Sequence, residues 1–181
     1  MGASHAVAVL LDDDLVTFNR VVGVVRRRNL PITGIAVGPS HMTGVSRLTF
    51  FTEADDAAAD RLVRQLEKTF GVRAAALYRA DDAVVREVAL IKLRALPAAR
   101  ADLLAALSAA GATLVAERDG TCIVEIAGES ARTDACLQAL DRFGILEVAR
   151  SGAVALQGLD GAGSPPPSTT LSAPHSSEVT L

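Results

Sequence analysis

The order of predicted elements constrains the fold most, because the series strand, helix, strand, strand, helix, strand occurs twice along the chain. The first series covers about residues 5–80 and the second about residues 86–157. Each series has the order of a ferredoxin-like unit, in which an antiparallel sheet carries two helices on one face. The sequence therefore predicts an α+β protein of two tandem ferredoxin-like (βαββαβ) domains, at residues 1–80 and 81–158.

The first series is predicted from its apolar spacing and its turns. A continuous apolar run at residues 6–11 is typical of a central strand. The acids of residues 12–14 are expected to cap the next helix, and coordination of a cation is the less frequent role for such acids. Further strands are predicted at residues 32–37, 46–52 and 72–78. The predicted buried faces of the two helices consist of Leu15, Phe18, Val21, Val22 and Val25, and of Ala59, Leu62, Val63, Leu66 and Phe70.

The second series repeats this order. Its first strand is predicted at residues 87–95, followed by a helix over residues 97–110. Asp119-Gly120 predicts a tight hairpin between the next two strands, and the last strand region is predicted at residues 145–156. The residues expected to face inward from its two helices are Leu103, Leu104 and Leu107, and Cys136, Leu137, Leu140 and Phe143.

Charge and composition exclude several classes of function. A net charge of -3 and a pI near 5.6 give no general attraction to nucleic acid or to anionic membranes. No apolar run approaches the length of a membrane span, and the first residues lack a signal pattern, so we expect a cytoplasmic protein. His5, His41 and His175 have no metal-ligand spacing, and neither a metal nor a cofactor is expected. Cys122 and Cys136 lie in apolar patterns and are predicted to be buried thiols.

The C-terminal end of the chain differs in composition from the rest. Residues 159–181 are rich in Gly, Ser, Pro and Thr, with three consecutive prolines at residues 165–167. Such a segment cannot bury enough apolar surface to offset the entropy of ordering, and it is predicted to be a disordered tail.

Neither series carries a recognisable catalytic set. There is no Ser-His-Asp combination and no glycine-rich phosphate loop, and Glu87 and Lys92 lie on opposite faces of one predicted strand. The strands also lack the aromatic and basic pairs that stack RNA bases. A ferredoxin-like unit leaves one sheet face bare, so apolar residues on both sides of several strands predict packing or edge pairing between copies or subunits. The pattern favours sensing or assembly by a dimer over catalysis.

Four segments, at the right separations, resemble one family, the regulatory (small) subunits of acetolactate synthase. The matching segments are Ile35-Ala36-Val37-Gly38-Pro39, Val45-Ser46-Arg47-Leu48-Thr49, residues 86–92 and residues 145–152. The resemblance covers about residues 6–158 and implies an ACT domain followed by an ACT-like domain. It further implies a non-catalytic subunit that raises the activity of a thiamine-diphosphate-dependent catalytic (large) subunit in branched-chain amino acid biosynthesis. Branched-chain amino acids, usually valine, would inhibit the enzyme by binding at the interface between the ACT domains of two subunits.

The turn that should hold this effector departs from the family pattern. Val16 stands where the family has a glycine, and Asp13 stands where it has an asparagine. Pro31 replaces a second asparagine at the start of the second strand. These changes remove neutral donors and add a side chain where backbone amides approach a carboxylate, so a weak or altered valine response is expected. The candidate effector residues are Asp12, Asp13, Val16, Thr17, Phe18, Pro31 and Ile32.

Two arginines are candidate interface residues. Arg47 lies within an apolar strand and Arg150 within a terminal one, and simple exposure of either side chain is the alternative. The leading hypothesis is a regulatory subunit of acetolactate synthase. The alternative is a freestanding ACT-type ligand-sensing module that regulates a different enzyme.

Overall fold

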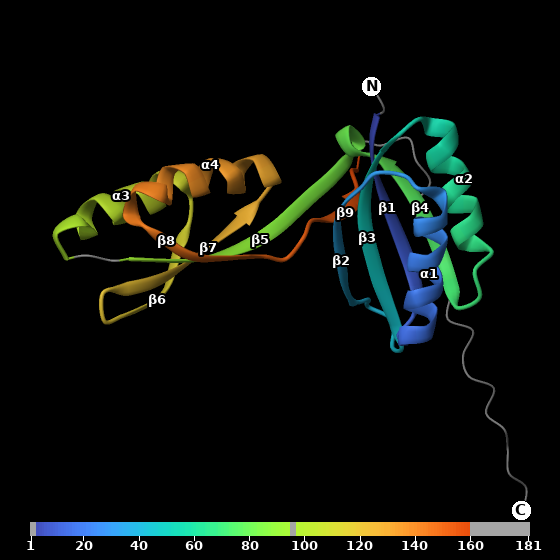
Figure 1. Cartoon of the computed structure of the whole chain (residues 1–181), viewed down its shortest axis with the longest axis horizontal. Coiled ribbons are helices and arrows are strands. Elements are labelled where there is room, and N and C mark those ends of the chain that lie inside the picture. Colours follow the sequence, from blue (N-terminus) through green and yellow to red (C-terminus); the bar gives the residue numbers. More distant parts are fainter. Residues whose placement is uncertain (1–2, 95–96, 160–181) are drawn as a thin grey trace, which may run out of the picture.

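The computed structural model describes residues 3–94 and 97–159, which form two antiparallel sheets with two α-helices each (Figure 1). The elements of the first half are β1 (Ala3–Asp12), α1 (Leu15–Arg28), β2 (Ile32–Pro39), β3 (Val45–Ala54), α2 (Asp56–Glu67) and β4 (Val72–Arg79). The elements of the second half are β5 (Ala83–Arg94), α3 (Arg100–Ala110), β6 (Thr113–Arg118), β7 (Thr121–Gly128), α4 (Ser130–Leu140), β8 (Ile145–Arg150) and β9 (Val154–Gln157). Short 3-10 helices occur at Ala80–Asp82, Pro97–Ala99 and Asp141–Phe143.

The strand order confirms the predicted fold class. The first sheet has the order β2-β3-β1-β4, and the main path of the second has the equivalent order β6-β7-β5-β8. Both are the order of a ferredoxin-like unit. The division of the chain at residue 80 stays a prediction, and the predicted tail lies outside the described residues except for Leu159. No helix among the described residues is long and apolar enough to cross a membrane.

The first core lies between the first sheet and the two helices that cover one of its faces, α1 and α2 (Figure 1). Val7 and Val9 of β1, Phe50 of β3 and Leu62 and Leu66 of α2 are almost completely buried there. Each such side chain contributes roughly 1.5–3 kcal/mol relative to an exposed position. This core fixes the end of β1 and the start of α1, which together form the turn of the candidate site.

The opposite face of the first sheet is covered in part by the chain itself. The first residues of β5 pair with β9, and this ribbon packs over Ala6, Ala76 and Tyr78. Ala155 of β9 is 1% exposed, and its carbonyl oxygen accepts a hydrogen bond of 2.8 Å from Nη2 of Arg47. The expected bare face of this sheet is therefore not available as a whole to another subunit.

The second core resembles the first, but its sheet keeps an open face. Ala89, Ile91 and Leu93 of β5 point toward α3 and α4, and the alternate residues Val88 and Leu90 are exposed by about two fifths. The predicted buried thiols, Cys122 and Cys136, are confirmed as free cysteines in this core. Burial raises the pKa of both thiols, as expected for packing rather than reactive residues.

Part of the predicted helix orientation is wrong. The residues predicted to be buried but found exposed are Leu15, Val22, Phe70 and Leu104. The inner face of α1 instead carries Thr17, Val21 and Val24, because the polar Thr17 is drawn inward at the first turn, where it bonds the helix cap. Phe70 follows the end of α2, and the guanidinium of Arg20 lies over its ring at 5.3 Å.

Candidate functional site

The turn between β1 and α1 is held by its own backbone amides. The N–H of Asp12 donates to the carbonyl of Gly71 at 2.8 Å, and the N–H of Asp13 donates to the carbonyl of Gly44 at 3.0 Å. The N–H of Asp14 donates to the carbonyl of Asp12 at 2.8 Å. These three amides are therefore committed within the protein, where a bound carboxylate would need donors.

Asp14 caps the first helix. Its carboxylate accepts hydrogen bonds from the N–H and from Oγ1 of Thr17, both at 2.8 Å. The bond from the Thr17 amide, followed by that from its hydroxyl, holds the pKa of Asp14 below its ordinary value. The N-terminus of α1, which attracts anions, thus already carries a negative charge from the chain itself. The prediction that the acids cap this helix is confirmed for Asp14.

The other two acids of the turn are also paired. Oδ1 of Asp12 lies 2.6 Å from Nε of Arg73, and Oδ1 of Asp13 accepts a hydrogen bond of 2.8 Å from Oγ of Ser46. Asp13 therefore acts as an acceptor that ties the turn to β3. An asparagine would offer a donor at this position, whereas an ionised aspartate has none.

A pocket of about 290 Å³ lies beside this turn. Its lining residues are Leu11, Asp12, Asp13, Asp14, Leu15, Phe18, Val37 and Ser46. The aliphatic and aromatic side chains form its apolar part, and the three acids and Ser46 form its polar part. We call it the turn pocket. Val37 belongs to β2, which has no neighbour on its outer side among the described strands, so the pocket lies next to an edge of the first sheet.

The structure brings only some of the predicted effector residues to the turn pocket. Asp12, Asp13 and Phe18 line it. Val16 is outside the lining and 57% exposed, and Thr17 is buried against the cap. The predicted grouping of these residues in one site is therefore only partly present.

The predicted residues at the start of the second strand also lie outside the lining. Pro31 is exposed just before β2, and Ile32 packs against the first core. Sequence reasoning missed Leu11, Val37 and Ser46 as pocket residues. Ser46 pairs with Leu11 across β1 and β3, so the register of the two strands is the signal that places it there.

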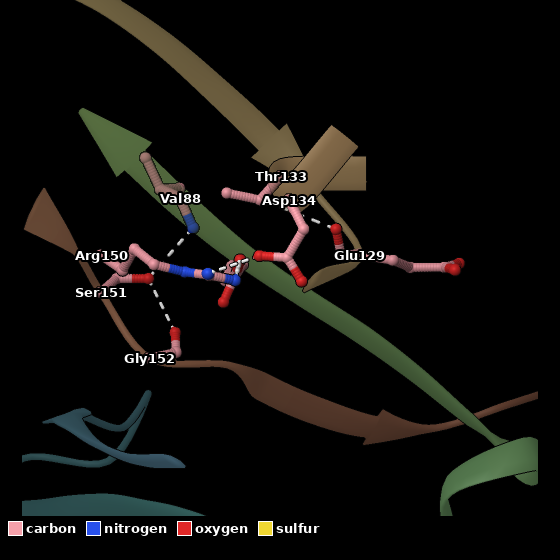
Figure 2. A network of polar contacts seen from close by, with 8 residues as sticks. Val88, Glu129, Thr133, Asp134, Arg150, Ser151 and Gly152 are labelled. Carbon is pink, nitrogen blue, oxygen red and sulfur yellow. Dashed lines mark hydrogen bonds and ion pairs between the residues drawn. The ribbon is translucent and has the colours of Figure 1, made fainter. Parts of the chain in front are cut away.

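The two candidate interface arginines make contacts within the chain. Arg47 bonds Ala155, as described above. Arg150 donates from Nη2 to Oε1 of Glu87, and from Nη1 to Oδ1 of Asp134 at 2.7 Å. Figure 2 shows the Arg150 side chain reaching across to Asp134 near the start of α4. These bonds, first of all the one with Glu87, raise the pKa of Arg150. A role of either arginine between subunits stays a prediction.

Within residues 3–94 and 97–159, no three His, Cys, Asp or Glu side chains are grouped so that they could hold a metal ion. The acids of the turn bond to hydroxyl, amide and guanidinium groups instead. The described part of the turn is therefore arranged to hold its own conformation.

Comparison with known proteins identifies the family. Residues 86–158 match the family described as the small subunit of acetolactate synthase, and residues 17–74 match the AHAS small subunit-like ACT domain. The acetolactate synthase small subunit of Mycobacterium leprae is 30% identical over 153 residues, which cover 84% of this chain and 90% of that protein. A probable acetolactate synthase small subunit of Archaeoglobus fulgidus is 29% identical over 153 residues, which cover 84% of this chain and 95% of that protein.

A solved structure agrees with the sequence comparison. The crystal structure of the acetolactate synthase small subunit from Thermotoga maritima superposes with a TM-score of 0.78 at 25% identity. The match covers 87% of this chain and 99% of that one, so both halves take part. This chain belongs to the acetolactate synthase small-subunit family.

Proposed function

We propose that this protein is a non-catalytic regulatory subunit that binds and activates the catalytic subunit of an acetolactate synthase. The observation that carries the proposal is the match of both halves of the chain, at residues 17–74 and 86–158, to the small-subunit family. The test is co-purification of this chain with an acetolactate synthase catalytic chain from the same organism. Stable co-elution supports the proposal, and separate elution at micromolar concentrations of both chains contradicts it.

The catalytic partner, in this proposal, holds thiamine diphosphate and makes the precursors of the branched-chain amino acids. The regulatory chain needs no cofactor of its own for that role. Both chains would act in the cytoplasm, in line with the two buried free cysteines of this chain.

We further propose a homodimer formed through the edge strand β2. Ile35 and Val37 on this strand are 52% and 51% exposed, and β2 pairs only with β3 among the described strands. An unpaired strand with exposed aliphatic residues is a template for pairing with a second strand. Because Val37 also lines the turn pocket, a second copy on this edge would cover the pocket and add residues to it.

The proposed response to valine is weak or altered. The carboxylate of an amino acid at this turn would meet three acids, one of which already occupies the N-terminus of α1. The three backbone amides of residues 12–14 are bonded within the protein. Calorimetric titration of the isolated chain with valine tests this step, and saturable binding with micromolar affinity at the turn pocket would refute it.

A freestanding ACT-type sensor of a different enzyme is the second candidate. The observation that favours it is the presence of three acids in the lining of the turn pocket, because they oppose the carboxylate of a branched-chain amino acid. The two candidate functions differ in the enzyme that this chain would bind. Failure to bind or stimulate any acetolactate synthase catalytic chain would favour the freestanding sensor.

A further inference from the structure

The two helices that cover the first sheet are rich in arginine. α1 has four arginines and no acidic residue, and α2 has two arginines and three acids. The six arginines, all of them exposed, are Arg20, Arg26, Arg27, Arg28, Arg61 and Arg64. We call the surface that they form the arginine face. It is positively charged, although the whole chain has a net charge of -3.

The arginine face runs across both helices. α1 and α2 lie side by side on the first sheet (Figure 1), and Nε of Arg28 in α1 donates to Oε1 of Gln65 in α2 at 2.6 Å. The guanidinium of Arg20 lies 5.3 Å from the ring centre of Phe70, which follows α2. Arg27 comes about two helical turns after Arg20, so both lie on the same side of α1. The arginines of the two helices therefore form one surface.

Among the described residues, no acid pairs with the arginine face. Its six arginines take part in none of the ion pairs of this part of the chain. In α2, Asp56 instead bonds to His5 at 3.0 Å. The helices of the second half differ, because Arg100 pairs with Glu117 and Arg132 donates to carbonyls at the end of α3. The charge of the arginine face is therefore not neutralised by contacts within the described chain.

A local role explains only part of the arginine face. Residues 26–28 occupy the last turn of α1 and Arg64 the last turn of α2, where positive charge stabilises a helix. Arg20 and Arg61 lie outside these turns. Like charges on neighbouring turns of a helix repel one another, so carboxylates from a partner would stabilise this surface.

Exposed apolar residues accompany the arginines. Phe70, next to Arg20, is 80% exposed, and Val16, one turn earlier on α1, is exposed as well. Arginine together with aromatic residues is typical of the residues that dominate binding between proteins. A nucleic acid or an anionic membrane would be repelled at longer range by the net negative charge of the chain. The composition therefore favours a protein partner with acidic side chains.

The arginine face stays accessible in the assembly proposed above. The opposite face of the first sheet is covered in part by the ribbon of β5 and β9, and the proposed homodimer uses the edge strand β2. The two helices lie on neither of these surfaces (Figure 1). A dimer would therefore present two arginine faces, one on each copy.

We propose that the arginine face binds an acidic surface of the acetolactate synthase catalytic chain. Carboxylates of that surface pair with the guanidinium groups, each of which can hold a carboxylate through two parallel hydrogen bonds. Apolar side chains among the carboxylates pack against Phe70 and Val16. This inference rests on the proposed function, because it names the surface through which the chain contacts that partner.

The experiment measures binding of the full chain to the immobilised catalytic chain of the same organism by surface plasmon resonance. Arg27→Glu/Arg64→Glu reverses one charge on each helix. The matched control, Arg94→Glu/Arg142→Glu, changes the net charge equally at two exposed arginines of the second half that form no ion pair with a described residue. Each protein is measured between about 50 and about 500 mM NaCl, because salt screens exposed charges. Circular dichroism checks that the variants fold.

We expect saturable binding of the wild type that weakens as the salt concentration rises. Arg27→Glu/Arg64→Glu should weaken the affinity at low salt by at least about tenfold, mainly through slower association, and the control by less than about threefold. If the reversed variant does not fold, the comparison of Arg27→Gln/Arg64→Gln with Arg94→Gln/Arg142→Gln decides, and only the first pair should weaken binding.

The outcomes that contradict the inference are distinct from those that contradict the proposed function. Failure of the wild type to bind the catalytic chain overturns both. Wild-type binding that does not depend on salt, or that is weakened equally by the arginine-face variant and its control, overturns this inference alone. Unchanged affinity of the folded arginine-face variant does the same. Tighter binding of a mixed-sequence RNA than of the catalytic chain to the arginine face would also overturn it.

Discussion

Replacement of Gly71 by alanine is predicted to damage the turn between β1 and α1 specifically. Gly71 has a φ of +87°, and a Cβ there would lie 2.3 Å from Oγ1 and 2.6 Å from Cγ2 of Thr17. Thr17 cannot easily move away, because it is 2% exposed and its hydroxyl donates to the cap residue Asp14. The carbonyl of Gly71 also accepts the bond from Asp12, so displacement of this residue would pull on the turn.

The expected loss of stability in Gly71→Ala has two parts. A left-handed conformation costs a residue with a Cβ roughly 1–2 kcal/mol, and forcing extra atoms into a packed site costs roughly 1–3 kcal/mol. Gly71→Ala should therefore lower the free energy of unfolding by about 2–5 kcal/mol. Gly44→Ala is the matched control, since Gly44 has a φ of +72° but nothing within 4 Å of the position that a Cβ would take, and it should cost only about 1–2 kcal/mol.

Urea unfolding followed by tyrosine fluorescence measures both variants. The chain has one tyrosine and no tryptophan, and Tyr78 is a buried residue of β4 in the first sheet, so the signal reports on the first half. Thr17→Ala in the Gly71→Ala background should recover part of the loss, because it removes the two nearest of the three Thr17 atoms that the new Cβ meets. Equal destabilisation by Gly71→Ala and Gly44→Ala would refute the packing argument.

Three further perturbations test other parts of the structure. Hydrogen bonds lower the pKa of Asp14. The contribution of its carboxylate to the free energy of unfolding is therefore complete above the ordinary carboxyl pKa and is lost as the pH falls through the lower folded-state pKa. The stability difference between wild type and Asp14→Ala, from urea unfolding at several pH values, should thus shrink in acid; a constant difference would contradict this. Arg47→Ala removes the bond to Ala155 and should speed amide hydrogen exchange in β9, through a local loss of stability of about 1–3 kcal/mol. The control Arg61→Ala changes an exposed residue and should leave the exchange in β9 unchanged. Equal exchange rates in β9 of the two variants would contradict a role of Arg47 in holding this strand. Val37→Lys should convert the proposed dimer to a monomer in size-exclusion chromatography with light scattering, and an unchanged dimer would argue against pairing through β2.

The fold could be predicted from the sequence because each element has a clear local signal. The hairpin at Asp119-Gly120 is one example, since both residues have the positive φ that such a turn requires. What the sequence did not reveal depends on contacts between distant segments. The strand predicted from Glu87 begins at Ala83, because its first residues pair with β9, and helix faces were misjudged where a cap drew Thr17 inward.

The candidate site was predictable in part for the same reason. The acids of the turn follow directly from the end of β1, and Asp12 and Asp13 do line the turn pocket. Ser46 and Val37 come from strands that reach the pocket only through the register of the first sheet, which a single sequence does not specify. The pairing of Arg150 with Glu87 likewise requires β5 and β8 to be neighbours.

The most direct test of the regulatory role is a reconstitution assay. Acetolactate formation from pyruvate is measured with the catalytic chain alone, with increasing amounts of this protein, and then with added valine. We predict a saturable rise in rate at a fixed ratio of the two chains, and little inhibition by valine at concentrations that inhibit a subunit with the family's usual turn. A rate that stays at the level of the catalytic chain alone, with both chains folded, would contradict the account.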